Sequence, residues 1–384
     1  MNLLIYEWDG YGYAEIREVL TEHGVHVDTI RFESKTTNIY DDFPKVFREK
    51  LKENTYDAVF SFNFVHNVAE ACYEHNIKYI SWTYDSPVNI QGMEHKLGYP
   101  TSYSFFFDKL QVKKYKDMGF EHIYHLPLAA NTKRLSKIKP DALAKTFYEA
   151  DISFVGRLYE SRFPHIWKEL SPYMQGYLKA AVLSQEKLYG CNIYEELITD
   201  EILTRINLDY TKGHRTNYLS KAQVTFQMNT YTTNQERKLL LAALSEIGTT
   251  KFYSTDRIDV LKNVVQMGPV TYRDRMPLVF KLSKINLNIS LKCIYSGIPL
   301  RAIDILGSGG FLLSNYQPEL AEFFIPDEEL VLYTGIDDAV EKAKFYLAHD
   351  TLRQQIAQKG FERINKDFTF ETQLTKIFKI CDLV

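Results

Sequence analysis

The sequence predicts an α/β protein that consists of two doubly wound domains, each built on a parallel sheet. The length of 384 residues exceeds what one hydrophobic core serves, because single cores stop growing at about 250–300 residues. Short apolar runs alternate with amphipathic stretches along both halves of the chain, the pattern of strands that alternate with helices. The stretch L-P-L-A-A-N-T-K-R-L (126–135), followed by polar residues and Pro140, separates the halves and is typical of a connection between domains.

The first half, residues 1–140, opens with the apolar run Leu3–Tyr6, which predicts a strand. Gly10 and Gly12 follow it, and then an amphipathic helix that ends at Gly24. The pattern predicts further strands at residues 25–30, 57–62, 78–84, 103–107 and 123–126, and helices at 67–75 and 108–118. We therefore expect this half to be one doubly wound domain.

The second domain is expected at residues 141–366. Its first strand is Asp151–Val155, whereas residues 171–245 lack strand alternation and predict a helical segment. Further strands are expected at residues 251–253, 264–267, 285–289 and 311–314, and helices at 337–349, 351–365 and 368–383. Since ligands bind beyond the carboxyl ends of the strands in open parallel sheets, we expect functional residues in the loops that follow the strands.

Composition and charge exclude several classes of protein. A formal net charge of −3 provides no basic field, so neither nucleic acid nor an anionic membrane surface is an expected partner. Cys72, Cys191, Cys293 and Cys381 have neither metal-ligand nor disulfide spacing. No signal peptide and no apolar stretch of transmembrane length is visible, so a cytoplasmic protein without a transmembrane segment is expected.

The most informative stretch is Y-S-G-I-P-L-R-A-I-D-I-L-G-S-G-G-F-L-L-S-N at residues 295–315. If residues 299–306 form a helix, Arg301 and Asp304 share one face near its start. A helix N-terminus and an arginine both bind phosphate oxygens, whereas a carboxylate binds ribose hydroxyls. The small residues 308–310 would end the helix and turn the backbone into a buried strand. The alternative is a surface ion pair worth roughly a few tenths of a kcal/mol.

Two other loops extend this pattern. F-V-G-R-L (154–158) places Gly156 and Arg157 at the end of a strand, where a backbone loop and a guanidinium group would meet a diphosphate. G-P-V-T-Y (268–272) follows another strand, where a flat base would lie against the backbone. The order of these loops along the chain favours a nucleotide site over a surface ion pair.

The second domain resembles the nucleotide-sugar-binding half of GT-B glycosyltransferases, most closely the spore-maturation (CgeB-like) family. The matching stretches are F-V-G-R-L-Y-E-S-R (154–162), M-G-P-V-T-Y (267–272), S-K-I-N-L-N-I-S (283–290), S-G-I-P-L-R-A-I-D-I-L-G-S-G-G-F-L-L-S-N-Y (296–316) and A-Q-K-G-F-E-R-I (357–364). The first half resembles the partner domain of that family through F-S-F-N-F (60–64), I-S-W-T-Y-D-S-P (80–87) and H-L-P-L-A-A-N (125–131). The resemblance implies two Rossmann-like domains that face a central cleft, and a C-terminal helix at 367–384 that packs back on the first domain.

The resemblance also implies roles for particular residues. Asp304 matches the acidic residue that binds the nucleotide ribose, and the diphosphate contacts are Gly156, Arg157, Arg162 and Arg301. The helix N-terminus and the arginines would neutralise the leaving diphosphate. Neither a metal nor a cofactor is therefore expected, because the nucleotide-sugar donor is itself a substrate.

The remaining donor contacts implied by the resemblance are Val270 and Tyr272 at the base, and Ser296 and Gly297 on the nucleotide-sugar side. Many retaining relatives carry an acidic residue eight positions before the residue that matches Asp304. This chain has Ser296 at that position. The departure leaves the donor sugar and the retaining or inverting outcome open.

The first domain offers several candidates for the acceptor side. Asp85 follows a predicted strand and is a candidate general base, the alternative being a helix cap followed by proline. Asp9 is a second candidate base, and Trp8 and Gly10 beside it are candidates for sugar and acceptor contacts, with capping and core packing as alternatives. His66, in a loop after a strand, is a further candidate base that could equally be a solvated side chain.

The function that follows is transfer of a sugar, most simply a hexose, from a UDP-sugar to an acceptor hydroxyl or amide on a protein or glycan. Two alternatives stay open. One is a nucleotide-sugar epimerase or hydrolase on the same fold. The other is a binding protein that keeps the nucleotide-sugar site without the chemistry.

Overall fold

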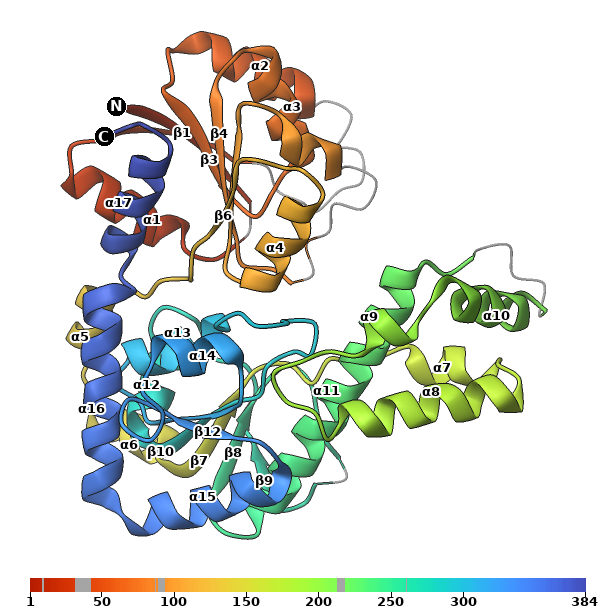
Figure 1. Ribbon diagram of the computed structural model, residues 1–384. Coiled ribbons are helices and arrows are strands. Elements are labelled where there is room, and N and C mark those ends of the chain that lie inside the picture. Colours follow the sequence, from red (N-terminus) through yellow and green to blue (C-terminus); the bar gives the residue numbers. More distant parts are fainter. Residues whose placement is uncertain (9, 32–42, 87, 89–93, 213–217, 260) are drawn as a thin grey trace. The chain divides into compact units, whose positions relative to one another are not determined.

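The computed structural model describes residues 1–8, 10–31, 43–86, 88, 94–212, 218–259 and 261–384 (Figure 1). The chain divides into two compact units. The first comprises residues 1–131 together with 366–384, and the second comprises residues 132–365. The units therefore divide at residue 131, nine residues before the predicted bound at 140, because the helices between 132 and 148 belong to the second unit.

The first unit contains a parallel six-stranded sheet in the order β2-β1-β3-β4-β5-β6. Its strands are β1 (Asn2–Glu7), β2 (His26–Arg31), β3 (Ala58–Phe62), β4 (Lys78–Thr83), β5 (Ser102–Phe106) and β6 (Ile123–His125). The strand order reverses between β1 and β3, so the loops after these two strands diverge. Such a switch point is where open α/β sheets bind ligands.

Helices cover this sheet. They are α1 (Tyr13–Glu22), α2 (Phe43–Glu53), α3 (His66–Glu74), η1 (Glu94–Gly98), α4 (Lys109–Asp117) and α17 (Phe370–Ile380). The C-terminal helix α17 lies beside α1 (Figure 1). A bridge between Ala130 and Thr369 ties the chain before α17 to the segment after β6. The last helix thus belongs to the first unit, although it follows the second along the chain.

The second unit also contains a parallel six-stranded sheet, in the order β12-β11-β10-β7-β8-β9. Its strands are β7 (Ala150–Val155), β8 (Thr250–Tyr253), β9 (Val264–Gln266), β10 (Ser283–Asn288), β11 (Leu312–Asn315) and β12 (Val331–Tyr333). Relative to chain order this is the 3-2-1-4-5-6 arrangement of dinucleotide-binding sheets, with the switch point between β7 and β10. The predicted fold class of two doubly wound parallel sheets is confirmed.

The helices of the second unit fall into two groups. Those beside the sheet are α5 (Thr132–Lys137), α6 (Ala142–Tyr148), α12 (Arg275–Leu282), α13 (Leu300–Gly307), α14 (Pro318–Phe323), α15 (Ile336–Ala348) and α16 (Asp350–Asp367). The helical segment consists of α7 (Phe163–Lys168), α8 (Pro172–Gln185), α9 (Tyr194–Leu197), α10 (Asp200–Thr211) and α11 (Lys221–Ser245). The segment has a core of its own, and α11 leads from it back to the sheet (Figure 1). No helix in the described ranges is long and apolar enough to cross a membrane.

A glycine in α16 allows this helix to pack closely on its neighbours. A Cβ atom at Gly360 would lie 2.3 Å from the carbonyl oxygen of Glu329 and 2.7 Å from a methyl group of Leu306. We predict that Gly360→Ala lowers the free energy of unfolding by about 1–3 kcal/mol, the usual cost of overpacking. Urea denaturation measures this change in the free energy of unfolding. Gly176→Ala in α8 is the matched control, because nothing lies within 4 Å of its added Cβ; an equal effect in both variants would contradict the prediction.

Candidate functional site

The switch point of the second sheet gathers most of the residues predicted to bind a nucleotide. β7 and β10 are neighbours in the sheet, so the loops after them begin side by side. The loop after β7 carries Gly156 and Arg157, and the chain after β10 leads through Ser296 to α13 with Arg301 and Asp304. Residues that are 140 positions apart in the sequence therefore reach the same edge of the sheet.

The loop after β7 is fixed by a half-buried carboxylate that the sequence did not indicate. Asp256 accepts a hydrogen bond from the backbone N–H of Leu158 at 2.6 Å and forms an ion pair with Arg157 at 3.3 Å. The Arg157 side chain remains 69% exposed, so it is available to a ligand. Arg162 lies further along, where it is the N-cap residue of α7 and is exposed.

Arg301 and Asp304 form an ion pair on α13, with 3.0 Å between Nη1 and Oδ2. The Asp304 side chain is only 4% exposed, whereas that of Arg301 is 28% exposed. The alternative of an ordinary surface pair is therefore wrong, because a buried carboxylate needs partners. Tyr272 is the second partner, since its hydroxyl donates to Oδ1 of Asp304 at 2.7 Å.

The bond from Tyr272 joins the loop after β9 to α13. Gly268 in this loop has a φ of +72°, and Val270 is half-buried. The predicted base-side and ribose-side residues, Tyr272 and Asp304, are thus in direct contact. A carboxylate has about four acceptor positions, and Tyr272 and Arg301 each bond to a different oxygen of Asp304.

The glycines after α13 act as the sequence predicts. Gly309 has a φ of +78°, and the N–H of Gly310 donates to the carbonyl oxygen of Ile305 at 3.0 Å. A Cβ atom at Gly310 would lie 2.8 Å from the carbonyl oxygen of Phe280. The helix therefore ends in a glycine cap that turns the chain into the buried strand β11.

Ser296 is paired with an acidic residue that the sequence analysis missed. Its hydroxyl donates to Oε1 of Glu319 on α14 at 2.7 Å, and the N–H of Glu319 donates to the carbonyl oxygen of Ser296 at 3.1 Å. Both residues and Gly297 are buried. A carboxylate is therefore present beside Ser296, supplied by a different element.

In the first unit, Asp85 follows β4 and is held by Asn63, which follows β3. The Nδ2 of Asn63 donates to Oδ2 of Asp85 at 2.7 Å, and its Oδ1 accepts from the N–H groups of Tyr84 and Asp85 at 3.0 and 3.2 Å. Asn63 has a φ of +57°, which asparagine tolerates better than most residues. Burial of the carboxyl group raises the pKa of Asp85, and the hydrogen bond from Asn63 partly offsets this rise.

The structure does not show Asp85 as the cap of a helix. Ser86 and Val88 are not helical, and Pro87 lies outside the described residues. Asp85 as a residue is exposed at the surface, although neighbouring groups remove part of the water around its carboxyl group. The carboxylate is thus oriented by an amide and open to solvent, as a general base that receives an acceptor proton requires.

Trp8 and Gly10 lie on either side of Asp9, which is outside the described residues. The Nε1 of Trp8 donates to the carbonyl oxygen of Phe62 at 3.0 Å, and its ring stacks on Tyr84 with centroids 6.0 Å apart. A Cβ atom at Gly10 would lie 2.9 Å from the hydroxyl of Tyr84. Trp8 is half-buried, so part of its ring remains accessible.

His66, the further candidate base, is the first residue of α3. Burial is the main cause that lowers the pKa of its imidazole, and the charge of Lys96 lowers it further. Its Nδ1 atom is buried and has no hydrogen-bond partner among the described residues. His66 is therefore a half-buried side chain and not simply a solvated one.

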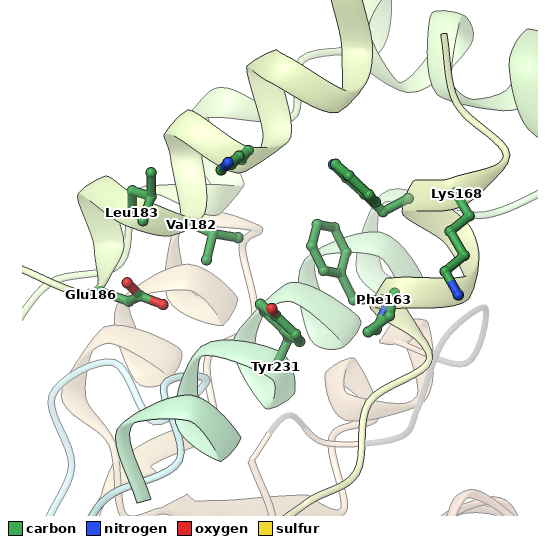
Figure 2. A pocket seen from close by; sticks show the side chains of 9 residues that line it. Phe163, Lys168, Val182, Leu183, Glu186 and Tyr231 are labelled. Carbon is green, nitrogen blue, oxygen red and sulfur yellow. The ribbon is translucent and has the colours of Figure 1, made fainter. Parts of the chain in front are cut away.

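A separate cavity of about 330 Å³ lies within the helical segment (Figure 2). Figure 2 shows Phe163 on α7, Val182 on α8 and Tyr231 on α11 around it, with Glu186 at one side. Burial and the nearby charge of Glu236 raise the pKa of Glu186. The cavity has the size of a small-ligand site, but it contains neither a glycine loop nor an arginine. The glycine loop and the arginines that the sequence predicts for a nucleotide lie at the switch point instead.

Within the ranges that the structure describes, no group of three or more His, Cys, Asp or Glu side chains is arranged to hold a metal ion. The polar groups at the switch point are arginines, the buried carboxylate of Asp304 and a helix N-terminus. These groups can bind and stabilise a phosphorylated ligand by themselves.

Comparison with known proteins agrees with this geometry. Residues 235–379 match the family described as Glycosyl transferase-like. That range includes β8 to β12, and therefore Tyr272, Arg301 and Asp304. Among curated proteins, none matches the sequence.

Solved structures match the whole chain at low identity. A crystal structure of Anabaena Alr3699/HepE in complex with UDP has a TM-score of 0.58 and 9% identity, with 100% of both chains covered. Sucrose-phosphate synthase from Thermosynechococcus elongatus has a TM-score of 0.60 and 11% identity, covering 100% of this chain and 98% of that one. A glycosyltransferase from Rickettsia africae ESF-5 has a TM-score of 0.58 and 10% identity, covering 99% and 97%. The chain therefore has the fold of GT-B glycosyltransferases, as the resemblance implied.

Proposed function

We propose that this protein is a metal-independent glycosyltransferase of the CgeB-like kind that acts in the cytoplasm. It transfers a sugar, a hexose in the simplest case, from a UDP-sugar to a hydroxyl or amide on a protein or glycan. The observation that carries the proposal is the Arg301–Asp304 pair at the start of α13, with Asp304 buried and bonded to Tyr272. This pair lies beside the glycine loop after β7, at the switch point of the second sheet.

The proposed roles follow the chemistry of each group. Arg157 and Arg301 bind the diphosphate together with the N-terminus of α13, and Gly156 keeps the loop after β7 free of a side chain at this point, so the leaving group is stabilised without a cation. Asp304 accepts the ribose hydroxyls. UDP is the proposed nucleotide because the solved structures that share the fold include HepE in complexes with UDP and with UDP-glucose.

On the acceptor side, Asp85 is the proposed general base. A raised pKa increases the affinity of the carboxylate for a proton. This favours transfer of the proton from the acceptor hydroxyl to the carboxylate in the transition state. Asp9 is the alternative base. Trp8 contributes an accessible ring face on which an acceptor sugar can stack, next to Gly10.

Thermal unfolding with UDP, GDP, dTDP and ADP, each in EDTA, tests the proposal. A ligand at 100 times its dissociation constant stabilises the folded state by about 2.7 kcal/mol. For domains of this size, at roughly 2–4 °C per kcal/mol, the shift in Tm is roughly 5–11 °C. We expect a shift with UDP and UDP-sugars, and a smaller or absent shift with the other nucleotides. No shift with any of the four, with or without Mg²⁺, would contradict the proposal.

One observation favours a second candidate, a binding protein without catalysis. Ser296 is buried and its hydroxyl is already bonded to Glu319, so it does not present a free group to a donor sugar. Incubation with UDP-sugars and a broad acceptor panel distinguishes the candidates. A glycosylated product supports transfer, a converted donor without acceptor supports an epimerase or hydrolase, and binding without turnover supports the second candidate.

A further inference from the structure

A buried arginine joins the two loops that meet at the switch point of the second sheet. Arg237, on α11, is 6% exposed. One terminal nitrogen of its guanidinium group donates to the carbonyl oxygen of Arg157, and the other donates to that of Ile289. Arg157 follows β7 and Ile289 follows β10. A single planar group therefore fixes the distance between these two loops.

Two aromatic rings enclose this guanidinium group. The ring centroids of Phe154 and Tyr159 lie 5.1 and 4.8 Å from its central carbon. Tyr159 has a φ of +58°, a left-handed conformation that costs free energy for an aromatic residue. The contact with Arg237 offsets part of that cost, so the conformation of the loop after β7 depends on the arginine beneath it.

Neighbouring residues of α11 hold the same two loops. The Nδ2 of Asn234 donates to the carbonyl oxygen of Leu158 at 3.1 Å. Lys292, in the loop after β10, donates its backbone N–H to Oγ1 of Thr233 at 3.0 Å and forms a buried ion pair with Glu236 at 2.9 Å. The stretch 233–237 is therefore a brace between the helical segment and the predicted nucleotide site.

The charges of this brace are not balanced. Asp304 pairs with Arg301, and Glu236 pairs with Lys292. Arg237 has no ion pair within the described parts of the chain, although a buried charge without a counter-ion is costly. Burial lowers the pKa of Arg237, and the nearby Tyr159 and the carboxylate of Glu236 partly offset this fall.

We propose that Arg237 is a positioning residue for the donor diphosphate. It holds the backbone of the loop after β7 against the loop after β10, so that Arg157 presents its guanidinium group to the phosphates. Its buried charge adds to the attraction. The inference rests on the proposed function, because it assumes that the anion at the switch point is the diphosphate of the donor.

The experiment measures binding of UDP and of uridine to the full chain and to the variants Arg237→Lys and Arg237→Met. Lysine keeps the charge but cannot bond both carbonyl groups with one planar fork. We expect the dissociation constant for UDP to rise roughly tenfold or more in both variants, on the scale of a lost charged hydrogen bond. The dissociation constant for uridine, which has no phosphate, stays within about twofold. This phosphate-specific loss is not expected from a purely structural role.

Arg353→Lys and Arg353→Met are the matched controls, because Arg353 is equally buried at 6% exposure and also donates to a carbonyl oxygen, that of Tyr346. They should lower the Tm without changing UDP binding. Tyr159→Gly is a milder variant, since glycine suits the positive φ and only the ring over Arg237 is lost. It should weaken UDP binding severalfold even if the Arg237 variants do not fold.

The outcomes separate the positioning role of Arg237 from the proposed function. If wild-type protein binds UDP and the variants at Arg237 and Tyr159 bind it equally well, the positioning role is wrong. Equal loss of UDP and uridine binding would mean general damage to the site and would also overturn it. If the wild-type protein binds no nucleotide at all, the proposed function fails, and this inference fails with it.

Discussion

Asp85→Asn is expected to lower kcat for sugar transfer by roughly 100- to 10,000-fold, the usual contribution of a general base. The amide removes the proton acceptor but keeps the size of the side chain. Donor binding should stay at the wild-type level, because Asp85 lies in the first unit and the donor residues lie in the second. Steady-state kinetics together with UDP titration measures both effects.

The pH dependence of the rate provides an independent check on this base. Asp85 acts in its ionised form, so kcat/KM falls as the pH falls through its pKa. Burial raises that pKa, and the inflection should therefore lie above the ordinary aspartate value of about 3.9. In Asn63→Gly the positive φ is still tolerated, but the hydrogen bond that lowers the pKa is lost. The inflection should then move to still higher pH.

Asp57→Asn is the matched control for this prediction. Asp57 is an exposed aspartate of the same unit that accepts one backbone hydrogen bond, from Asn2 at 2.7 Å, and it precedes β3. It therefore lies at the amino end of the sheet, away from the loops that follow the strands. If Asp85→Asn keeps wild-type kcat and Asp9→Asn does not, Asp9 is the base and the assignment of Asp85 is wrong.

The strands of both sheets could be predicted largely because parallel strands are buried on both faces and read as apolar runs. Strand β12 (Val331–Tyr333) escaped the prediction, although with Leu330 it forms an apolar run as long as those that predicted β6 and β9. Helix α2 also escaped it, although its sequence contains the signal. Phe47 and Leu51 are spaced four residues apart and are both buried, so this helix was predictable.

The contacts of the candidate site also differ in how well the sequence predicts them: local contacts could be predicted, and long-range contacts could not. Arg301 and Asp304 could be paired from the sequence because they lie three residues apart on one helix. Arg237 and Ile289 are 52 residues apart, and nothing in the periodicity of α11 distinguishes a buried arginine from an exposed one. Glu319 beside Ser296 is a similar case. Such contacts follow from the strand order, which the sequence pattern does not specify.

Arg301→Ala is expected to weaken UDP binding by about 1.5–3 kcal/mol, the range of a hydrogen bond to a charged group. This corresponds to a rise in the dissociation constant of roughly 10- to 150-fold. The same change leaves the buried carboxylate of Asp304 with Tyr272 as its remaining partner among the bonds described above. The variant should therefore also unfold at a lower temperature, and UDP binding must be titrated at a temperature where it is fully folded.

Arg205→Ala is the control that separates these effects, because Arg205 forms a comparable helical ion pair with Glu201 at 2.7 Å in α10. Both of those side chains are more than half exposed, so their pair contributes little to stability and lies outside the switch point. We expect this variant to match the wild type in Tm and in UDP affinity. A loss of Tm without a loss of UDP affinity in Arg301→Ala would show that the pair only stabilises α13. The nucleotide site would then have to be sought elsewhere in the second unit.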